Sequence, residues 1–355
     1  MFSLGACEMS RTLHRFATVA LLIAWLQGQA SADPVAPEHA RLDPIPAAPA
    51  SVASAPTPWI DLGSSPIVEA NAAPPRDHKL AAALTLAGVY AGFTTWTYFA
   101  WYRQHKPLSE FKWGGDGYFG SRTYAGGADK LGHAWATMSL ARAGTEMLHQ
   151  WGGYSKLGST LVSTALSELL FLGVEVKDGF YYQFSYGDAV FDTAGALAAV
   201  ALSLSPRLDE LFDFRVEYWP SHEYRRQLDG GNVNIAEDYS GETYLLAFHL
   251  GGLRSLREAR WGGWSRFVDV AVGFGTRGYK PDPPDRENMP DYPHRQEMSI
   301  GLSLNMQGLS DWLFDRRSKA ARKVGHGMFE VFSLGYVPIL QHTNRPTGAV
   351  ATDGA

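Results

Sequence analysis

The sequence has almost no cysteine, and this scarcity excludes several classes of protein. Cys7 is the only cysteine among 355 residues, and it lies in a segment that we expect to be removed from the mature chain. Disulfide frameworks and cysteine-ligated metal sites are therefore excluded. The formal net charge is only -5, and no run of lysine or arginine is present. Nucleic acid is excluded as a partner on that ground.

Motifs of several common enzymes are also missing. No serine lies in a nucleophile elbow, and no glycine-rich loop is suited to hold a phosphate. The histidines of the C-terminal half lack the spacing of metal ligands; they are His222, His249, His294, His326 and His342. Any chemistry must therefore come from the first part of the chain.

The N-terminus predicts export. Arg11 and Arg15 precede the apolar run FATVALLIAWL, and the small residues of 30–32 offer a cleavage point. We expect a signal peptide over 1–32 and a linker rich in proline and alanine over 33–78. The stretch LGAC ending at Cys7 resembles a lipoprotein acceptor site, but it precedes the apolar run. The expected anchor is instead the helix that begins at Leu80.

Four helices are predicted over 79–206. Residues 80–102 carry no formal charge, are flanked by basic residues and end in tryptophans and tyrosines, as expected of a membrane-spanning helix. A buried helix of a soluble bundle is the alternative. Further helices are expected at roughly 130–151, 157–177 and 188–204, and each carries charge. Because a charged residue at the bilayer centre costs about 2.5–3.5 kcal/mol, these charges must face inward or stay outside the lipid.

After Pro206 the pattern changes to alternation of period two, which predicts an antiparallel sheet or partial barrel over 207–345 and a flexible tail over 346–355. The expected strands are FRVEYW, TYLLAFHLGGL, RFVDVAVGFG, EMSIGLSLNM and MFEVFSLGYVPI, the last beginning at Met328. One face of two of these strands is apolar and could face lipid in an outer-membrane protein. Its residues are Val268, Val270, Val272, Ile300, Leu302 and Leu304. The fold class is therefore α+β, with a membrane-embedded or membrane-docked four-helix bundle before the sheet.

Ionisable residues recur at helical spacing on three of the helices, so each helix can present them on one face. We expect them to face a shared interior as a ligand-binding or pairing cluster. The members of this predicted cluster are Asp129, Lys130, His133, Glu168, Glu175, Asp178, Asp188 and Asp192.

Three roles are open to the cluster. Carboxylates and an imidazole could hold a divalent metal ion, although the Glu-x-x-His spacing of di-iron bundles is absent. His133 and Glu175 are candidates for catalytic acid and base. The structural alternative is that Lys130 pairs with an acid, His133 bonds an aspartate and Asp188 caps its helix.

Residues 129–220 resemble the YfiM-like family of uncharacterised, predicted periplasmic lipoproteins. The matching segments are DKLGHAWATMSLAR, VEVKDGF, FSYGDAVFDTAGA and EYWPS. The order of Asp129, Lys130, His133, Glu175, Asp188, Asp192 and Gly195 is more distantly similar to the VanZ-like membrane family. Asp192 replaces an asparagine of that pattern, and Asp178 replaces a glutamine. The resemblance implies an envelope protein and supplies no activity.

From these features we expect an exported bacterial cell-envelope protein that contacts membrane lipid. A structural or lipid-linked binding role is favoured, and an enzyme acting on a lipid or cell-wall precursor is the alternative. The inner membrane, with the protein facing the periplasm, is favoured over the outer membrane.

Overall fold

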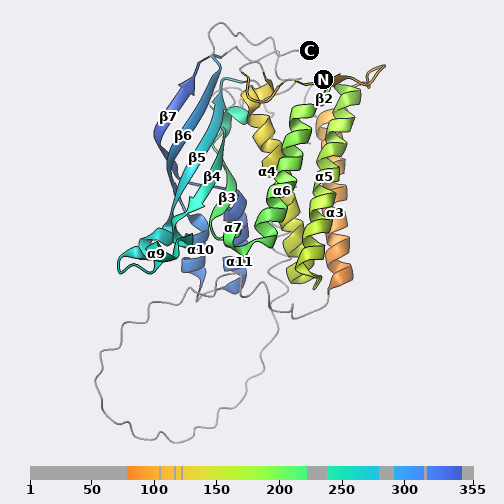
Figure 1. Ribbon diagram of the computed structural model, residues 1–355. Coiled ribbons are helices and arrows are strands. Elements are labelled where there is room, and N and C mark those ends of the chain that lie inside the picture. Colours follow the sequence, from red (N-terminus) through yellow and green to blue (C-terminus); the bar gives the residue numbers. More distant parts are fainter. Residues whose placement is uncertain are drawn as a thin grey trace, which may run out of the picture.

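The computed structural model describes residues 78–103, 105–115, 117–120, 123–221, 238–279, 292–315 and 318–345. The expected signal peptide and C-terminal tail, and all of the expected linker except His78, lie outside these residues. The described chain is α+β, with a helical bundle followed by an antiparallel sheet, as the sequence predicts (Figure 1).

The bundle contains α3 (Lys79–Thr97), α4 (Ala128–Glu146), α5 (Lys156–Tyr181) and α6 (Tyr186–Leu204). α3 continues into a π-helical turn at Tyr98–Tyr102, and α4 into one at Met147–Trp151. Short parallel strands β1 (Trp113–Gly114) and β2 (Phe184–Ser185) pair beside the end of α5. α4, α5 and α6 pack against one another, and α3 contacts the turn that follows α4.

Three helices are long and apolar enough to cross a membrane: Lys79–Tyr102, Lys156–Tyr181 and Tyr186–Leu204. In the described part of the chain α4 is not among them, because charged residues interrupt its apolar sequence.

The sheet has the order β3-β4-β5-β6-β7, with every pair of neighbours antiparallel. It follows a short helix α7 (Pro206–Asp209). The strands are β3 (Phe212–Tyr218), β4 (Glu242–His249), β5 (Val268–Arg277), β6 (Arg295–Leu304) and β7 (Tyr336–Asn344). They run in the same general direction as the bundle helices (Figure 1).

Apolar side chains occupy one face of the sheet and polar or small ones the other. One cross-strand row of the apolar face joins Phe214, Leu246, Val272, Ile300 and Leu340. α4 covers this face only at the β3 end, where its side chains pack with Phe214, Val216 and Tyr244 of the sheet. The remaining members of the row are exposed.

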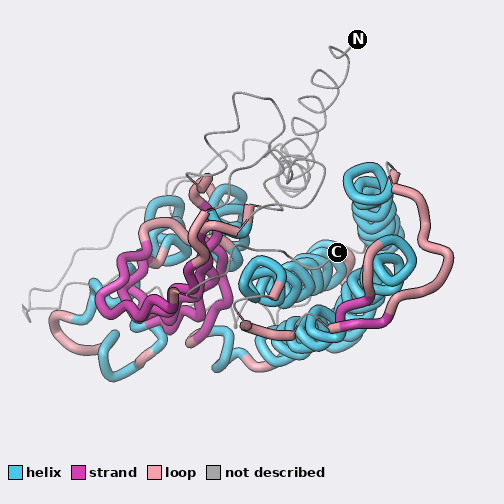
Figure 2. The backbone as a smooth tube through the Cα atoms, turned by 90° about the horizontal axis from the view of Figure 1, so that it is seen from above, coloured by secondary structure: helices cyan, strands magenta, loops and turns pink. Residues whose placement is uncertain are grey.

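The sheet curls until its first and last strands approach each other (Figure 2). Ser333 donates its backbone N–H to the carbonyl of Val216 at 2.9 Å. Glu217 Oε1 accepts from the backbone N–H groups of Gly335, at 2.7 Å, and Tyr336. The polar face therefore becomes the interior of a small, partly closed barrel.

Two expectations about the C-terminal region are wrong. The strand expected from Met328 is in part a helix, because α11 (Lys319–Val331) continues through this residue and β7 begins only at Tyr336. The strand expected to reach Met306 ends at Leu304, because the Asn305 side chain caps α10 (Met306–Phe314) by accepting from Gly308 N. Short helix α9 (Arg254–Arg257) lies near α10 at the same end of the sheet (Figure 1).

Candidate functional site

The candidate site lies where the first turns of α4 and α6 meet the end of α5. Lys130 is fully buried, and its Nζ lies 2.9 Å from Asp129 Oδ2 and 2.8 Å from Asp188 Oδ1. Gly187 leaves room for this lysine, since a Cβ at that position would lie 2.7 Å from Lys130 Cε. The ion pairs therefore join the beginnings of α4 and α6.

His133 lies one turn further along α4 and is held by Asp192 of α6. Its Nδ1 is 3.0 Å from Asp192 Oδ1, which also accepts from the Thr137 hydroxyl at 3.1 Å. An aspartate carboxylate can only accept, so Nδ1 carries the hydrogen in this arrangement. Nε2 is the ring nitrogen that faces α5, and it lies 3.7 Å from Glu175 Oε1.

Glu175 is fixed by the turn between α5 and α6. Its side chain is 1% exposed, and Oε2 accepts from the backbone N–H of Ser185 at 3.2 Å. The Ser185 hydroxyl in turn caps α6 by accepting from Asp188 N. The expectation that Asp188 caps this helix is wrong, and its carboxylate is instead available to Lys130.

Gly195 sets the spacing between the helices. A Cβ on this residue would lie 2.2 Å from the carbonyl oxygen of Ala134, so α6 can approach α4 closely only with glycine here. This contact brings Asp192 within reach of His133.

Six of the eight residues expected to cluster lie together, and we call them the bundle cluster: Asp129, Lys130, His133, Glu175, Asp188 and Asp192. The structure places the other two elsewhere on α5. Glu168 Oε1 accepts from the Thr193 hydroxyl of α6 at 2.7 Å, and Asp178 accepts from the Tyr102 hydroxyl at 2.7 Å. These two contacts tie α5 to its neighbours.

The bundle cluster contains more acids than bases. Asp129, Glu175, Asp188 and Asp192 carry carboxyl groups, whereas Lys130 and His133 carry the basic groups. One donor atom each of His133, Glu175 and Asp188 lies within 4.8 Å of the others. Carboxylates at this density in a buried site require protons, ion pairs or a bound cation. The geometry is therefore suited to holding positive charge.

Sequence reasoning missed a second group of buried ionisable residues, inside the curled sheet. We call it the sheet network: Asp213, Arg215, His249 and Asp269, with the amides of Asn305 and Gln307. The Arg215 guanidinium donates to Asp213, to Asp269 at 2.9 Å and to Gln307 at 2.6 Å. The available signal was the polar half of the period-two pattern, because Asp213 and Arg215 alternate with the apolar residues of β3.

The ion pairs of the sheet network change the acidity of its members. Burial opposes protonation of His249, but Asp213 and Asp269 outweigh this effect and raise its pKa to about 9. Burial acts in the opposite direction on the Asp213 carboxyl, yet Arg215 and His249 lower its pKa well below the usual range. Both groups are therefore charged at neutral pH.

Arg142, further along α4, contacts two other helices. It pairs with Asp209 of α7 at 2.6 Å and with Glu330 of α11. Glu146 pairs with Lys156 at the start of α5. Charged side chains of α4 thus pair with neighbouring elements from its first turn to its last.

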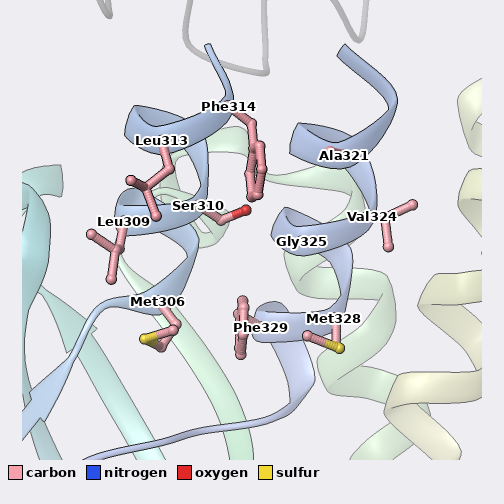
Figure 3. A pocket seen from close by; sticks show the side chains of 10 residues that line it. All are labelled: Met306, Leu309, Ser310, Leu313, Phe314, Ala321, Val324, Gly325, Met328 and Phe329. Carbon is pink, nitrogen blue, oxygen red and sulfur yellow. The ribbon is translucent and has the colours of Figure 1, made fainter. Parts of the chain in front are cut away.

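An apolar pocket of about 340 Å³ lies between α10 and α11 (Figure 3). The Ser310 hydroxyl points between the two helices, and Phe314 and Phe329 lie at either end. The residues that line the pocket include no ionisable side chain and no member of the bundle cluster. It is a gap in apolar packing away from the candidate site.

Comparison with known protein families gave one match. The family model described as predicted periplasmic lipoprotein (DUF2279) matches residues 115–204, about a quarter of the chain, and this segment contains the whole bundle cluster. No curated protein and no solved structure matches the chain significantly. Over the matched residues the chain is similar to predicted periplasmic lipoproteins, which supports an exported location in the cell envelope.

Proposed function

We propose that the protein is an integral membrane component of the cell envelope, with α3, α5 and α6 in the lipid bilayer and the bundle cluster as a buried ligand-binding site. The single observation that carries this proposal is the inverted polarity of the bundle. Its interior holds charged side chains, whereas large apolar side chains cover its exterior. Among these, Leu80 is 73% exposed, Leu169 66% and Leu197 65%.

Inverted polarity favours lipid over water as the surroundings. Contiguous apolar surface on a soluble protein is unfavourable, and large exposed patches mark contact with membranes or partners. Charged residues within membrane proteins face the bundle interior and pair with one another, as Lys130 does with Asp188. In water, the same arrangement would bury the charged groups of the bundle and expose its large apolar side chains to solvent, and both are unfavourable.

Aromatic side chains at one end of the bundle support the same orientation. Tyr98 and Phe99 at the end of α3 are exposed, as are Trp113, Tyr182 and Tyr186. Trp113 stacks on Tyr186 with ring planes 17° apart. Rings of this kind gather where a membrane meets water.

A binding role agrees with the burial of the bundle cluster better than acid–base catalysis on a large lipid. Glu175, one of the two candidate catalytic groups, is 1% exposed, whereas the His133 side chain is 20% exposed. A small ligand can reach the cluster past His133. A bulky substrate could not place its reacting atoms between His133 and Glu175 without separating the helices.

The sheet favours the outer membrane as a second candidate location. Its interior is polar, and much of its outer face is apolar and exposed, which is the polarity of an outer-membrane barrel wall. Of the residues expected to face lipid, Val272, Ile300, Leu302 and Leu304 are exposed, while Val268 and Val270 are half-buried. Separation of inner and outer membranes on a density gradient would distinguish the two locations.

Carbonate extraction of membranes tests the proposal. We expect the full-length protein to stay in the pellet at high pH, where peripheral proteins are released. Replacing Leu169 and Leu197 together by arginine should release it, since each charge costs about 2.5–3.5 kcal/mol in the bilayer centre. The matched control is Glu258→Arg, which changes an exposed residue outside the bundle. Release of the unmodified protein by carbonate would overturn the proposal.

A further inference from the structure

We propose that His133, Glu175 and Asp188 bind a divalent transition-metal cation. This inference rests on the proposed binding role of the bundle cluster and names its ligand. The three side chains come from three different helices, α4, α5 and α6, and each already has one atom fixed by a neighbour. One donor atom of each side chain lies within 4.8 Å of a donor atom of the other two.

The imidazole is oriented in the way that metal-binding histidines usually are. Asp192 accepts from Nδ1 at 3.0 Å and thereby fixes the ring and its tautomer. A carboxylate bonded to the far nitrogen is the common outer partner of a metal-ligating histidine. Nε2 faces Glu175, and a cation bound there would take the place of any proton on this nitrogen.

The two carboxylates are held in a comparable manner. Glu175 accepts from Ser185 N through Oε2, which leaves Oε1 toward His133. Asp188 receives Lys130 on Oδ1, which leaves its second oxygen for a ligand. Metal–ligand bonds of about 2.0–2.2 Å would require the three donor atoms, now within 4.8 Å of one another, to close by about 1 Å. Side-chain torsions can supply that movement.

Asp192 provides an independent indication that a partner is missing from this interior. Its side chain is fully buried, yet Oδ2 has no hydrogen-bond partner among the described residues. Buried oxygens of this kind are rare because leaving a charged group unsatisfied is costly. This oxygen belongs to the carboxylate that lies directly against the imidazole, so a cation at Nε2 would reduce the charge imbalance around it.

The types of ligand define the class of cation. One imidazole favours zinc, iron or nickel, and two carboxylates favour manganese, magnesium or calcium. The mixture is suited to Zn²⁺ or Mn²⁺ and less suited to Ca²⁺ or Mg²⁺, which prefer oxygen ligands alone. Three protein ligands leave coordination positions open for water or a small ligand that enters beside His133.

The test uses the full-length protein in detergent, stripped with chelator and titrated with Mn²⁺ and then with Zn²⁺. We expect one equivalent to bind. Glu175→Gln should weaken binding at least 10-fold, and Asp192→Asn about 10- to 100-fold through loss of the outer partner. The matched control is Glu168→Gln, which makes the same chemical change on the same helix, two turns away, and should bind as the unmodified protein does.

A second measurement does not depend on how the variants fold. Bound Mn²⁺ in the unmodified protein should show the electron spin-echo modulation of a coordinated imidazole nitrogen, and isotopic labelling of histidine with ¹⁵N should change it. The cation site would be overturned if neither Mn²⁺ nor Zn²⁺ binds at one equivalent. It would also be overturned if bound Mn²⁺ shows no signal from a coordinated nitrogen. The metal-binding results do not depend on carbonate extraction. If the cation site is wrong, the proposed membrane location still stands, and release of the protein by carbonate would contradict the membrane location without testing the cation site.

Discussion

The bundle cluster and the sheet network are both buried sets of charges, but only the sheet network is balanced. Asp213 and Asp269 face Arg215 and His249, and Asn305 and Gln307 satisfy further atoms. The bundle cluster has carboxyl groups in excess, and Asp192 Oδ2 has no hydrogen-bond partner in the part of the chain that the structure describes. The comparison teaches that burial of charge alone does not mark a site, whereas burial with unmatched charge does.

The largest expected effect comes from breaking the balanced set. Arg215→Met leaves Asp213 and Asp269 buried without their main counter-charge, which should cost about 3–5 kcal/mol of unfolding free energy. Thermal unfolding of the detergent-solubilised protein measures it. Arg215→Lys keeps the positive charge but loses the forked geometry of the guanidinium. Its unfolding midpoint should lie between those of the unmodified protein and Arg215→Met. An unchanged midpoint for Arg215→Met would show that the network contributes nothing to stability.

Replacing the lysine of the bundle cluster sharpens the contrast. Lys130→Met should destabilise the metal-free protein by about 3 kcal/mol, because Asp129 and Asp188 lose their cation. Added Mn²⁺ should raise the stability of Lys130→Met more than that of Arg215→Met, because Arg215→Met keeps the cation site of the unmodified protein and should gain only the stabilisation that the unmodified protein gains. If Mn²⁺ raises the stability of both variants by the same amount, the bundle cluster does not differ from the sheet network in its ability to accept a cation.

The pH dependence of stability should reflect His249 of the sheet network. Its pKa is raised from 6.5 to about 9 in the folded protein, so its stabilising effect is complete below about pH 6.5 and is lost as the pH rises through 9. The effect amounts to about 3 kcal/mol at most. Melting temperatures from pH 6 to pH 10 should fall in the unmodified protein and stay flatter in His249→Gln. Parallel curves for the two proteins would contradict this assignment.

The smallest expected effect comes from removing a single hydroxyl hydrogen bond to the bundle cluster. Thr137→Val keeps the shape of the side chain and removes the hydroxyl that donates to Asp192 at 3.1 Å, for a loss of about 1 kcal/mol. Chemical denaturation can resolve this difference, with Thr145→Val as control because the Thr145 hydroxyl bonds only the carbonyl of Ala141 within its own helix. A larger loss for Thr145→Val than for Thr137→Val would count against the role of Asp192.

Helical spacing and period-two alternation were enough to predict the fold class. Spacing along each helix also indicated the residues that form the bundle cluster, because a common face can be read locally. It could not separate Glu175 from Glu168, since both lie on one face of α5 and only the position of α6 decides which one meets His133. The sheet network escaped detection because its pairing depends on strand register and on the curling of the sheet.

The C-terminal helices were missed for a related reason. Residues 328–339 contain enough apolar and aromatic side chains to predict a strand, and local pattern does not reveal that Ser318 begins a helix by accepting a hydrogen bond from Ala321 N. Packing against the sheet and α4 decides the outcome there. Local sequence therefore predicted regular elements better than the points at which one element changes into another.

Arg142 and Trp135 connect α4 to the C-terminal helix α11. The guanidinium holds Asp209 and Glu330, and the Trp135 indole donates to the carbonyl of Val331 at 2.8 Å, so α4 is fastened to α11 at two points. Arg142 and His133 are nine residues apart, or about 13 Å along the axis. A displacement of α11 would therefore either break these contacts or move α4, which carries the imidazole of His133.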